Sequence, residues 1–319
     1  MIFRQIDRPE LDQPAWDSLT EPVSFFHSSV WSDVWVDALA PRGTAVFLCG
    51  FDGRSLVAGL PAVITRRLGI RSFYSMPNGT YGGAVFASEI DDNARQEFRD
   101  GLAAYLRQAR FDRVEIADFY GALTDWPDSP LGKSSAATHM IDLKDGVAYR
   151  PPDKKIMGHL HAGQKSGGEI VRVTDEMGLD PFYRLYRMTE GRHGRKRPRY
   201  TRRFFACLLR RMADNPALYW TAVLLNGEMI GSQINFIQGN TLFNWQTVSD
   251  YERRQHKPNH LLLEDAIRAG MARGAARVNL GASPPESDGL IDYKERWGGI
   301  RHEYNILSYR SRRHRWLRR

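Results

Sequence analysis

Cysteine is scarce in this chain of 319 residues, which contains only Cys49 and Cys207. Two cysteines cannot build the disulfide framework of a small secreted domain, and no cysteine or histidine spacing indicates a zinc site. Both lie in apolar runs, "AVFLCG" and "FFACLL", where a small buried hydrophobic side chain is the simpler interpretation. The sequence therefore predicts neither a disulfide-stabilised fold nor a metal centre.

Long hydrophobic runs are also missing. No stretch approaches the roughly 18 consecutive apolar residues of a membrane-spanning helix. The first residues, "MIFRQIDRPELDQ", lack the apolar core of a signal peptide. We therefore expect a cytoplasmic protein without an integral membrane segment. Hydrophobic residues still make up 42% of the chain, enough for packed cores, and the length favours two domains.

Positive charge exceeds negative charge, with 45 Lys and Arg against 37 Asp and Glu, a net charge of +8. Much of the excess lies in "GRHGRKRPRY" at 191–200 and in "RSRRHRWLRR" at 310–319. Such clusters favour anionic partners: nucleic acid such as tRNA, the surface of an anionic membrane, or a phosphorylated ligand. A solvated face and a frayed tail are the alternative, and the sequence leaves both open.

An internal repeat is the strongest pattern in the chain. "TAVFLCGFDG" at 44–53 and "TAVLLNG" at 221–227 are both rich in β-forming residues and end in Asp-Gly or Asn-Gly, a strong hairpin signal. Each is followed by an apolar strand, an amphipathic helix and a short strand. These expected elements are 56–64, 94–109 and 112–118 in the first half, and 229–237, 260–274 and 276–282 in the second.

The ordered repeat predicts a duplicated α/β unit. We expect one domain over 1–150 and another over 151–319. The join is expected within 144–168, which has the proline, glycine and lysine content of a linker.

Polar amides interrupt two of the expected strands. Gln233 and Asn235 lie in one, and Asn244 and Gln246 lie in the next. Alternation puts each pair on a single face of its strand, with Trp245 on the other face. Because buried amides are costly unless partnered, they either bond one another or line a cleft. Neighbouring glycines favour the cleft, and we treat the four amides as candidate substrate- or donor-binding residues.

The order of elements in the second half resembles the GNAT acyltransferase fold. The stretches "EIVRVTDEMGLDPFYRLYRMTEGRHG", "IGSQINFIQGNTLFNWQTVS" and "NHLLLEDAIRAGMARGAARVNLGASPP" resemble its FemAB-like branch, and "MPNGTYGG" at 76–83 extends the likeness into the first half. The resemblance covers most of the chain. It implies an α/β (α+β) fold of two tandem GNAT-like domains, each a mixed, largely antiparallel sheet covered by helices.

The resemblance also implies an acyltransferase. Members of this branch attach amino acids from charged tRNA to cell-wall peptides, or are N-acyltransferases associated with exopolysaccharide biosynthesis. We therefore expect acyl or aminoacyl transfer to an amine of a cell-envelope, peptidoglycan-precursor or exopolysaccharide-related acceptor. The donor substrate would be acyl-CoA or aminoacyl-tRNA, with no tightly bound cofactor. The alternative is a non-catalytic basic module that binds nucleic acid or another anionic polymer.

The expected phosphate-binding region departs from the GNAT pattern. Ordinary GNAT enzymes hold the cofactor pyrophosphate with a glycine-rich turn at a helix N-terminus, whereas the equivalent stretch here, "RRQHKPNHLLL" at 253–263, has no glycine. Arg253, Arg254 and Lys257 can meet donor phosphates by side chain, and Asn259 is a suitable N-cap. A capped basic helix start without a ligand is the alternative.

Three further candidates follow from the resemblance. In "GLIDYKERWGG", Lys294 occupies the position of the lysine that the family places at the active cleft. A surface lysine extended over apolar neighbours is the alternative. Tyr81 is expected in the acceptor groove. Asp118, which ends the strand "VEIAD", is the best candidate acid or base, although it can equally cap the next turn.

Overall fold

A computed structural model describes residues 1–316, which form two compact units. Unit 1 contains Met1–Ala136 and residues 303–316, and unit 2 contains Ala137–His302. Among these described residues, no helix combines the length and the apolar character needed to cross a membrane.

Unit 1 is a mixed, largely antiparallel sheet in the strand order β1-β2-β3-β4-β6-β13, with β5 paired to β3. Only β4 and β6 run parallel among these described pairs. The strands are β1 (Ile2–Asp7), β2 (Gly43–Asp52), β3 (Ser55–Arg67), β4 (Ile70–Ser75), β5 (Val85–Phe86), β6 (Arg113–Asp118) and β13 (Ile300–Arg310). The helices are α1 (Gln13–Thr20), α2 (Ser29–Leu39), α3 (Asp92–Ala109) and α9 (Arg312–Trp316).

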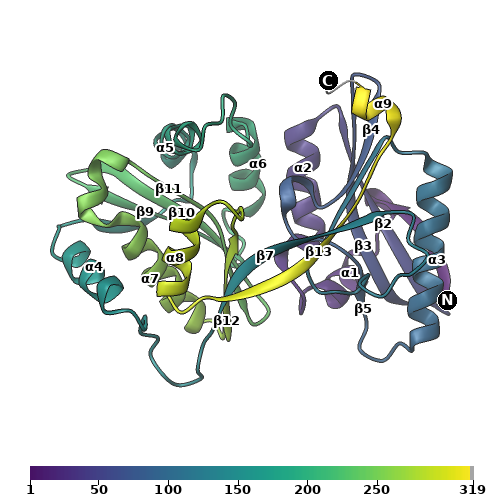
Figure 1. The fold of residues 1–319 in the computed structure, drawn as a ribbon, viewed down its shortest axis with the longest axis horizontal. Coiled ribbons are helices and arrows are strands. Elements are labelled where there is room, and N and C mark those ends of the chain that lie inside the picture. The colour runs from purple at the N-terminus through teal and green to yellow at the C-terminus, as the bar shows by residue number, and fades with distance from the viewer. Residues whose placement is uncertain (317–319) are drawn as a thin grey trace. The chain divides into compact units, whose positions relative to one another are not determined.

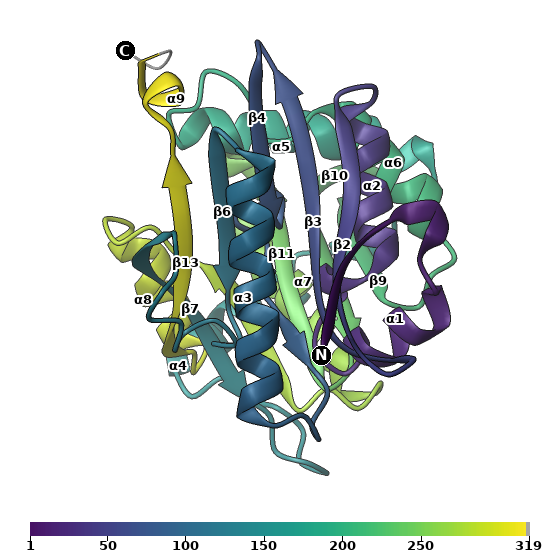
Figure 2. The ribbon, with the colours of Figure 1, turned by 90° about the vertical axis from the view of Figure 1, so that its right-hand side faces the viewer.

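Helices cover both faces of the unit 1 sheet because its strands are apolar on both faces. Along β2, Phe47 packs against Trp16 of α1, with ring centroids 4.8 Å apart. The next residue, Leu48, shares the opposite core with Phe98 of α3. Side chains alternate along a strand, so α1 and α3 lie on opposite faces (Figure 1). Figure 2 shows α3 lying along its face of the sheet.

Unit 2 has a sheet of the same kind, in the order β7-β12-β11-β10-β9-β8. The strands are β7 (Gly132–Asp142), β8 (Glu169–Arg172), β9 (Leu218–Leu225), β10 (Glu228–Gln238), β11 (Thr241–Ser249) and β12 (Arg277–Ala282). The helices are α4 (Lys154–Gln164), α5 (Leu179–Arg192), α6 (Arg202–Met212), α7 (Pro258–Met271) and α8 (Asp288–Arg296), and the 3-10 helix η5 (Tyr251–His256) precedes α7.

The two faces of the unit 2 sheet are also both covered. Trp220 of β9 packs against Phe182 of α5, with ring centroids 4.7 Å apart. Val223 of the same strand shares a core with Leu262 of α7. Helices α5 and α6 therefore lie on one side of the sheet and α7 lies on the other (Figure 1).

The repeat seen in the sequence corresponds to a repeated topology. The series β2-β3-β4-α3-β6 of unit 1 matches β9-β10-β11-α7-β12 of unit 2. In each series two antiparallel pairings are followed by one parallel pairing. The fold class expected from the sequence, an α/β fold with two helix-covered, largely antiparallel sheets, is confirmed.

The boundary between the units differs from the segment 144–168 suggested by composition. That segment lies inside unit 2. Ile141 of β7 pairs with Val278 of β12 in unit 2, whereas Leu307 near the end of the chain pairs with Ile116 of β6 in unit 1. Each sheet thus includes a strand that is far away in the sequence from its pairing partner. Local composition cannot predict such long-range pairing.

The parallel strand pairs of the two units end differently. In unit 2, β11 and β12 pair only as far as Phe243 and Asn279, although both strands continue. In unit 1 the chain after β4 folds back between the strand ends. The Gly82 N–H donates to the Ala117 carbonyl at 2.9 Å. The strand ends of unit 1 are therefore filled by the unit's own backbone.

The close approach at Gly82 gives a stability prediction. A Cβ at this position would lie 2.2 Å from the carbonyl carbon and oxygen of Ser75, so the backbone must shift. We expect Gly82→Ala to lower the free energy of unfolding by about 3 kcal/mol, measured by denaturant unfolding. The matched control is Gly158→Ala in α4, where a Cβ meets nothing within 4 Å. It should raise stability by about 0.5–1 kcal/mol. Equal free energies of unfolding for Gly82→Ala and Gly158→Ala would contradict the close approach of Gly82 to the Ser75 backbone.

Candidate functional site

Lys294 of α8 is buried in unit 2, with a relative exposure of 5%. Its Nζ donates to the carbonyl oxygens of Gly281 at 2.6 Å and Ala282 at 3.2 Å, and to Ser283 Oγ at 2.9 Å. These acceptors lie at the end of β12, beyond the last residue that pairs with β11. The surface-lysine alternative is therefore wrong.

A glycine turns the end of β12 away from regular pairing. Gly281 has a φ of +77°, a conformation that glycine adopts without strain. Its N–H donates to Asn279 Oδ1 at 2.8 Å, and the same oxygen accepts from Thr138 Oγ1 at 2.7 Å. The turn is thus fixed by side chains of β12 and β7, and Lys294 bonds the Gly281 carbonyl.

Burial changes the acid–base character of Lys294. Desolvation lowers the pKa of its amine from 10.5 to about 7, because removal from water disfavours the charged form. The three oxygen acceptors suit the ammonium form. An amine with this pKa can exchange a proton near neutral pH, and its cation can stabilise a developing negative charge.

The aromatic neighbours of Lys294 in the sequence anchor α8. Trp297, which follows the last turn of α8, is fully buried. It stacks with Tyr149, with ring planes 9° apart, and it lies within ring-contact distance of Tyr293 and His260. The Tyr149 hydroxyl donates to the Trp297 carbonyl. These contacts fix the helix that positions Lys294.

Three of the predicted amides bond one another. Asn244 Nδ2 donates to Asn235 Oδ1 at 2.9 Å, and Asn235 Nδ2 donates to Gln233 Oε1 at 3.1 Å. Gln233 Nε2 donates to Thr247 Oγ1 at 3.0 Å. Gln233 and Asn235 are almost fully buried. Of the two alternatives for these side chains, the structure shows the mutual network.

Gln246 does not lie on the same face of β11 as Asn244. Asn235 is opposite Asn244, while the preceding residue, Ile234, is opposite Gln246, so the register shifts at this point. Trp245 is the additional residue of a β-bulge. After the bulge, side chains alternate in the opposite sense, so Gln246 points to the other face of the sheet. Thr247, which was not predicted, joins the amide network instead. Trp245 is half-buried and packs against aromatic residues of the α5–α6 side.

The predicted phosphate-binding residues lie on and just after η5. Arg253 pairs with Glu228 at 3.4 Å. The Arg254 guanidinium lies 4.1 Å from the centroid of the Tyr251 ring. Tyr251 is 53% exposed, so this basic surface is open to solvent.

Lys257, and not Asn259, is the N-cap of α7. It has a φ of +53°, and Pro258 follows as the first helical residue. Asn259 is therefore inside the first turn, and its predicted capping role is wrong. The end of α4 packs against the same turn, because a Cβ on Gly163 would lie 3.3 Å from the Cβ of Lys257.

Tyr81 lies in the core of unit 1. It is 5% exposed and packs edge-on against Phe26 and Tyr304 and at 4.3 Å from Phe119. A ring so enclosed by aromatic neighbours has a packing role in unit 1. Its predicted place in an acceptor groove receives no support from these contacts.

Asp118 caps the turn that follows β6. It is fully buried, and its Oδ2 accepts from the Leu123 N–H at 2.9 Å. Burial raises the pKa of this carboxyl to about 6, against the opposing effect of the bonds from Leu123 and Ala122. Capping is thus the observed role, and a catalytic role for Asp118 stays a prediction.

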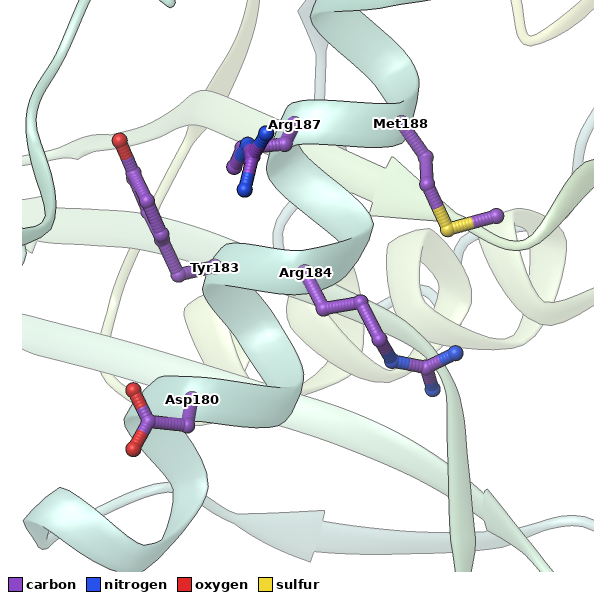
Figure 3. A pocket seen from close by; sticks show the side chains of 5 residues that line it. All are labelled: Asp180, Tyr183, Arg184, Arg187 and Met188. Carbon is purple, nitrogen blue, oxygen red and sulfur yellow. The ribbon is translucent and has the colours of Figure 1, made fainter.

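A surface pocket of about 490 Å³ lies along α5. Figure 3 shows Asp180, Tyr183 and Arg187 on one side of the helix and Arg184 and Met188 on the other. Asp180 is paired with Arg202 at 2.5 Å, and Arg184 is paired with Glu228 at 3.3 Å. None of the predicted site residues lines this pocket.

The part of the chain that contains Lys294 is similar to a known protein family. Residues 153–295 match the acetyltransferase (GNAT) domain family. This part of the chain therefore resembles a GNAT domain. Its class of reaction is acyl transfer, which confirms the expected enzyme class. A search of curated proteins gave no match.

The likeness to solved structures extends beyond the GNAT domain. The crystal structure of FemX is 12% identical and has a TM-score of 0.70, with 96% of this chain and 97% of that chain covered. A tandem GNAT protein from the clavulanic acid biosynthesis pathway is 14% identical, with a TM-score of 0.54 and coverage of 97% and 98%. The C-terminal domain of a putative lysylphosphatidylglycerol synthetase from Agrobacterium fabrum is 10% identical, with a TM-score of 0.58 and coverage of 93% and 91%. The chain thus has the tandem GNAT, FemAB-like fold.

Sequence reasoning missed the groups that surround Lys294. Ser283 follows β12 directly and was part of a loop without an assigned role. His139 of β7 is 2% exposed and interacts electrostatically with Lys294. A histidine within the strand "THMID" was the available signal, but nothing local indicates that β7 lies beside β12.

The raised pKa of Asp118 gives a pH prediction. Ionisation of the buried carboxyl lowers the free energy of unfolding. This loss of stability is absent below about pH 4, grows between about pH 4 and pH 6, and is complete above about pH 6. Asp118→Asn keeps an acceptor for the Leu123 N–H but cannot ionise. We expect its stability relative to the wild type to rise by on the order of 3 kcal/mol between pH 4 and pH 7.

Chemical denaturation at a series of pH values measures this difference. Asp118→Leu is the control, because it removes both the charge and the acceptor and should destabilise the fold relative to Asp118→Asn. A difference between the wild type and Asp118→Asn that does not change with pH would exclude a buried, titrating carboxyl.

Proposed function

We propose that this protein transfers an acyl or aminoacyl group to an amine, and that the reaction takes place in unit 2 beside Lys294. The observation that carries the proposal is the buried Lys294 ammonium at the point where β11 and β12 diverge. It is supported by the match of this part of the chain to the GNAT domain family.

The reaction requires an oxyanion stabiliser and a proton acceptor. An amine attacks the carbonyl of a thioester or ester, and a tetrahedral oxyanion forms before the thiol or alcohol leaves. We assign Lys294 to this oxyanion as its cation. A pKa of about 7 also lets the neutral amine of Lys294 first take a proton from the acceptor's ammonium group, which frees the amine that attacks and leaves Lys294 as the cation that faces the oxyanion.

The acceptor we favour is an amine of a cell-envelope component, such as a peptidoglycan precursor or an exopolysaccharide-related molecule. Two of the similar structures support an envelope role: FemX, and a putative synthetase named for lysylphosphatidylglycerol, a lipid that carries a lysyl group. Both are similar in fold at low identity, so the acceptor is part of the proposal.

For the donor we propose acyl-CoA or aminoacyl-tRNA, held in part by the basic surface of η5. Both donors carry phosphates, and the Arg254 guanidinium lies on the exposed Tyr251 ring beside the start of α7. Side-chain cations would then take over the role of the missing glycine turn.

The donor site is tested with Arg253→Ala combined with Arg254→Ala. Loss of two cations that contact phosphates should raise the donor Kd about tenfold or more and flatten its dependence on salt. The matched control is Arg66→Ala combined with Arg67→Ala, two exposed arginines of β3 in unit 1. Isothermal titration with acyl-CoAs and charged tRNAs makes the measurement. An unchanged donor Kd in the folded double variant would reject the assignment.

The proposed function is tested with Lys294→Met. We expect turnover to fall by about 10²–10³, the size of effect seen when one oxyanion donor is removed. A substrate pair is first found by a thermal-shift screen of acyl-CoAs, charged tRNAs and nucleotide-linked envelope precursors, because a specific ligand raises Tm.

The control for Lys294→Met is Lys144→Met, at an exposed position in the same unit. Lys144→Met should keep the wild-type Tm, whereas Lys294→Met should lower it by several degrees because the Gly281 and Ala282 carbonyls lose their donor. Turnover is therefore compared at a temperature at which both variants are folded. Near-normal turnover in Lys294→Met would contradict the proposal. Salt-sensitive binding of generic nucleic acid, with no binding of any acyl donor, would instead favour the basic binding module.

A further inference from the structure

A buried histidine lies beside Lys294. His139 belongs to β7, and its neighbours Thr138 and Met140 pair with Ala282 and Asn279 on either side of an irregularity in β12. The imidazole is 2% exposed. Neither ring nitrogen has a hydrogen-bond partner among the described residues. A buried polar ring without partners is costly, so a structural role alone does not account for a histidine here.

The end of α8 covers the His139 ring. Its Nε2 lies 3.9 Å from Glu295 Oε1, too far for a hydrogen bond. A Cβ on Gly299 would lie 3.1 Å from the His139 Cβ and 2.7 Å from the Lys294 carbonyl oxygen. The chain after α8 therefore packs closely on His139. Glu295 presents an anion to the ring, and the Lys294 ammonium is bonded to the carbonyl of Ala282, the residue paired with Thr138 next to His139.

The charges around His139 act in opposite directions. Burial, Lys294 and Arg301 of β13 all favour the neutral ring and lower its pKa, and Glu295 opposes them. Two cations in one poorly solvated place repel each other strongly. A proton on Lys294 therefore disfavours a proton on His139. When His139 is protonated, the Lys294 ammonium is disfavoured.

We propose that His139 is a positioning residue for Lys294, and that the two bases share a single positive charge. Neutral His139 lets Lys294 act as the cation of the site, and a proton on His139 opposes that charge. The shared charge follows from the packing of β7, β12 and α8. Its consequence for turnover rests on the proposed function of Lys294.

The shared charge is measured without any substrate. The wild-type protein, labelled with ¹³C at histidine Cε1, is titrated by NMR, and the His139 signal is assigned from its absence in His139→Gln. Lys294→Met removes the cation and should raise the pKa of His139 by about one pH unit. Glu295→Gln removes the anion and should lower it. Lys144→Met is the control and should leave it unchanged.

The pKa values are measured on proteins that keep the native histidine, and His139→Gln serves only to assign the signal. An equal pKa of His139 in the wild type and in Lys294→Met would overturn the proposal. A shift in the expected directions supports the shared charge even if Lys294→Met retains normal turnover. In that case only the proposed function of Lys294 fails.

The positioning role is tested by the pH dependence of kcat. With His139→Gln, no second positive charge can form next to Lys294 as the pH falls. The Lys294 ammonium then has no competing charge and its pKa should rise, so we expect the limb of the kcat profile that reports Lys294 to move to higher pH by about half a unit. A purely structural residue would lower kcat equally at all pH values. A profile that is scaled but not shifted would therefore overturn the positioning role.

Discussion

The end of pairing between two parallel strands is the constraint on which the site depends. Backbone carbonyls inside a protein need a hydrogen-bond donor, and a strand that leaves its neighbour loses the donors of the ladder. Unit 1 meets this need with its own backbone, since the Gly82 N–H reaches the Ala117 carbonyl. In unit 2 the carbonyls of Gly281 and Ala282 accept from the Lys294 ammonium. In two units of the same topology, the carbonyls at the end of the parallel pair thus accept from different donors, a backbone N–H in unit 1 and a side-chain ammonium in unit 2.

The hydrogen bonds from Lys294 to the strand carbonyls explain its burial and its acid–base properties. A side chain that bonds strand carbonyls must enter the sheet, so it is buried, and burial lowers the pKa of its amine to about 7. The helix that brings it there must be fixed, which the fully buried Trp297 provides. The features that make Lys294 suitable for acyl transfer are therefore consequences of its structural position.

Much of the fold and part of the site could be predicted from the sequence. The repeat and the position of Lys294 were visible because both leave a local pattern of residues. The face of Gln246 could not be predicted, because a one-residue bulge at Trp245 reverses the alternation. Asn259 is a good N-cap by residue type, but the left-handed backbone of Lys257 starts the helix earlier. His139 was missed because only tertiary pairing brings β7 beside β12.

The two units show how a duplicated fold can acquire a site in one copy. Both use a glycine at the end of the parallel pair, for different reasons. Gly82 permits a close approach, since any Cβ there would collide with Ser75, and this approach closes the strand ends of unit 1. Gly281 permits a positive φ, which turns β12 out of its ladder and leaves its carbonyls to a side chain. A backbone donor is chemically inert, whereas an ammonium donor can titrate and can stabilise an anion. The choice of donor is therefore what makes one copy a framework and the other a candidate active site.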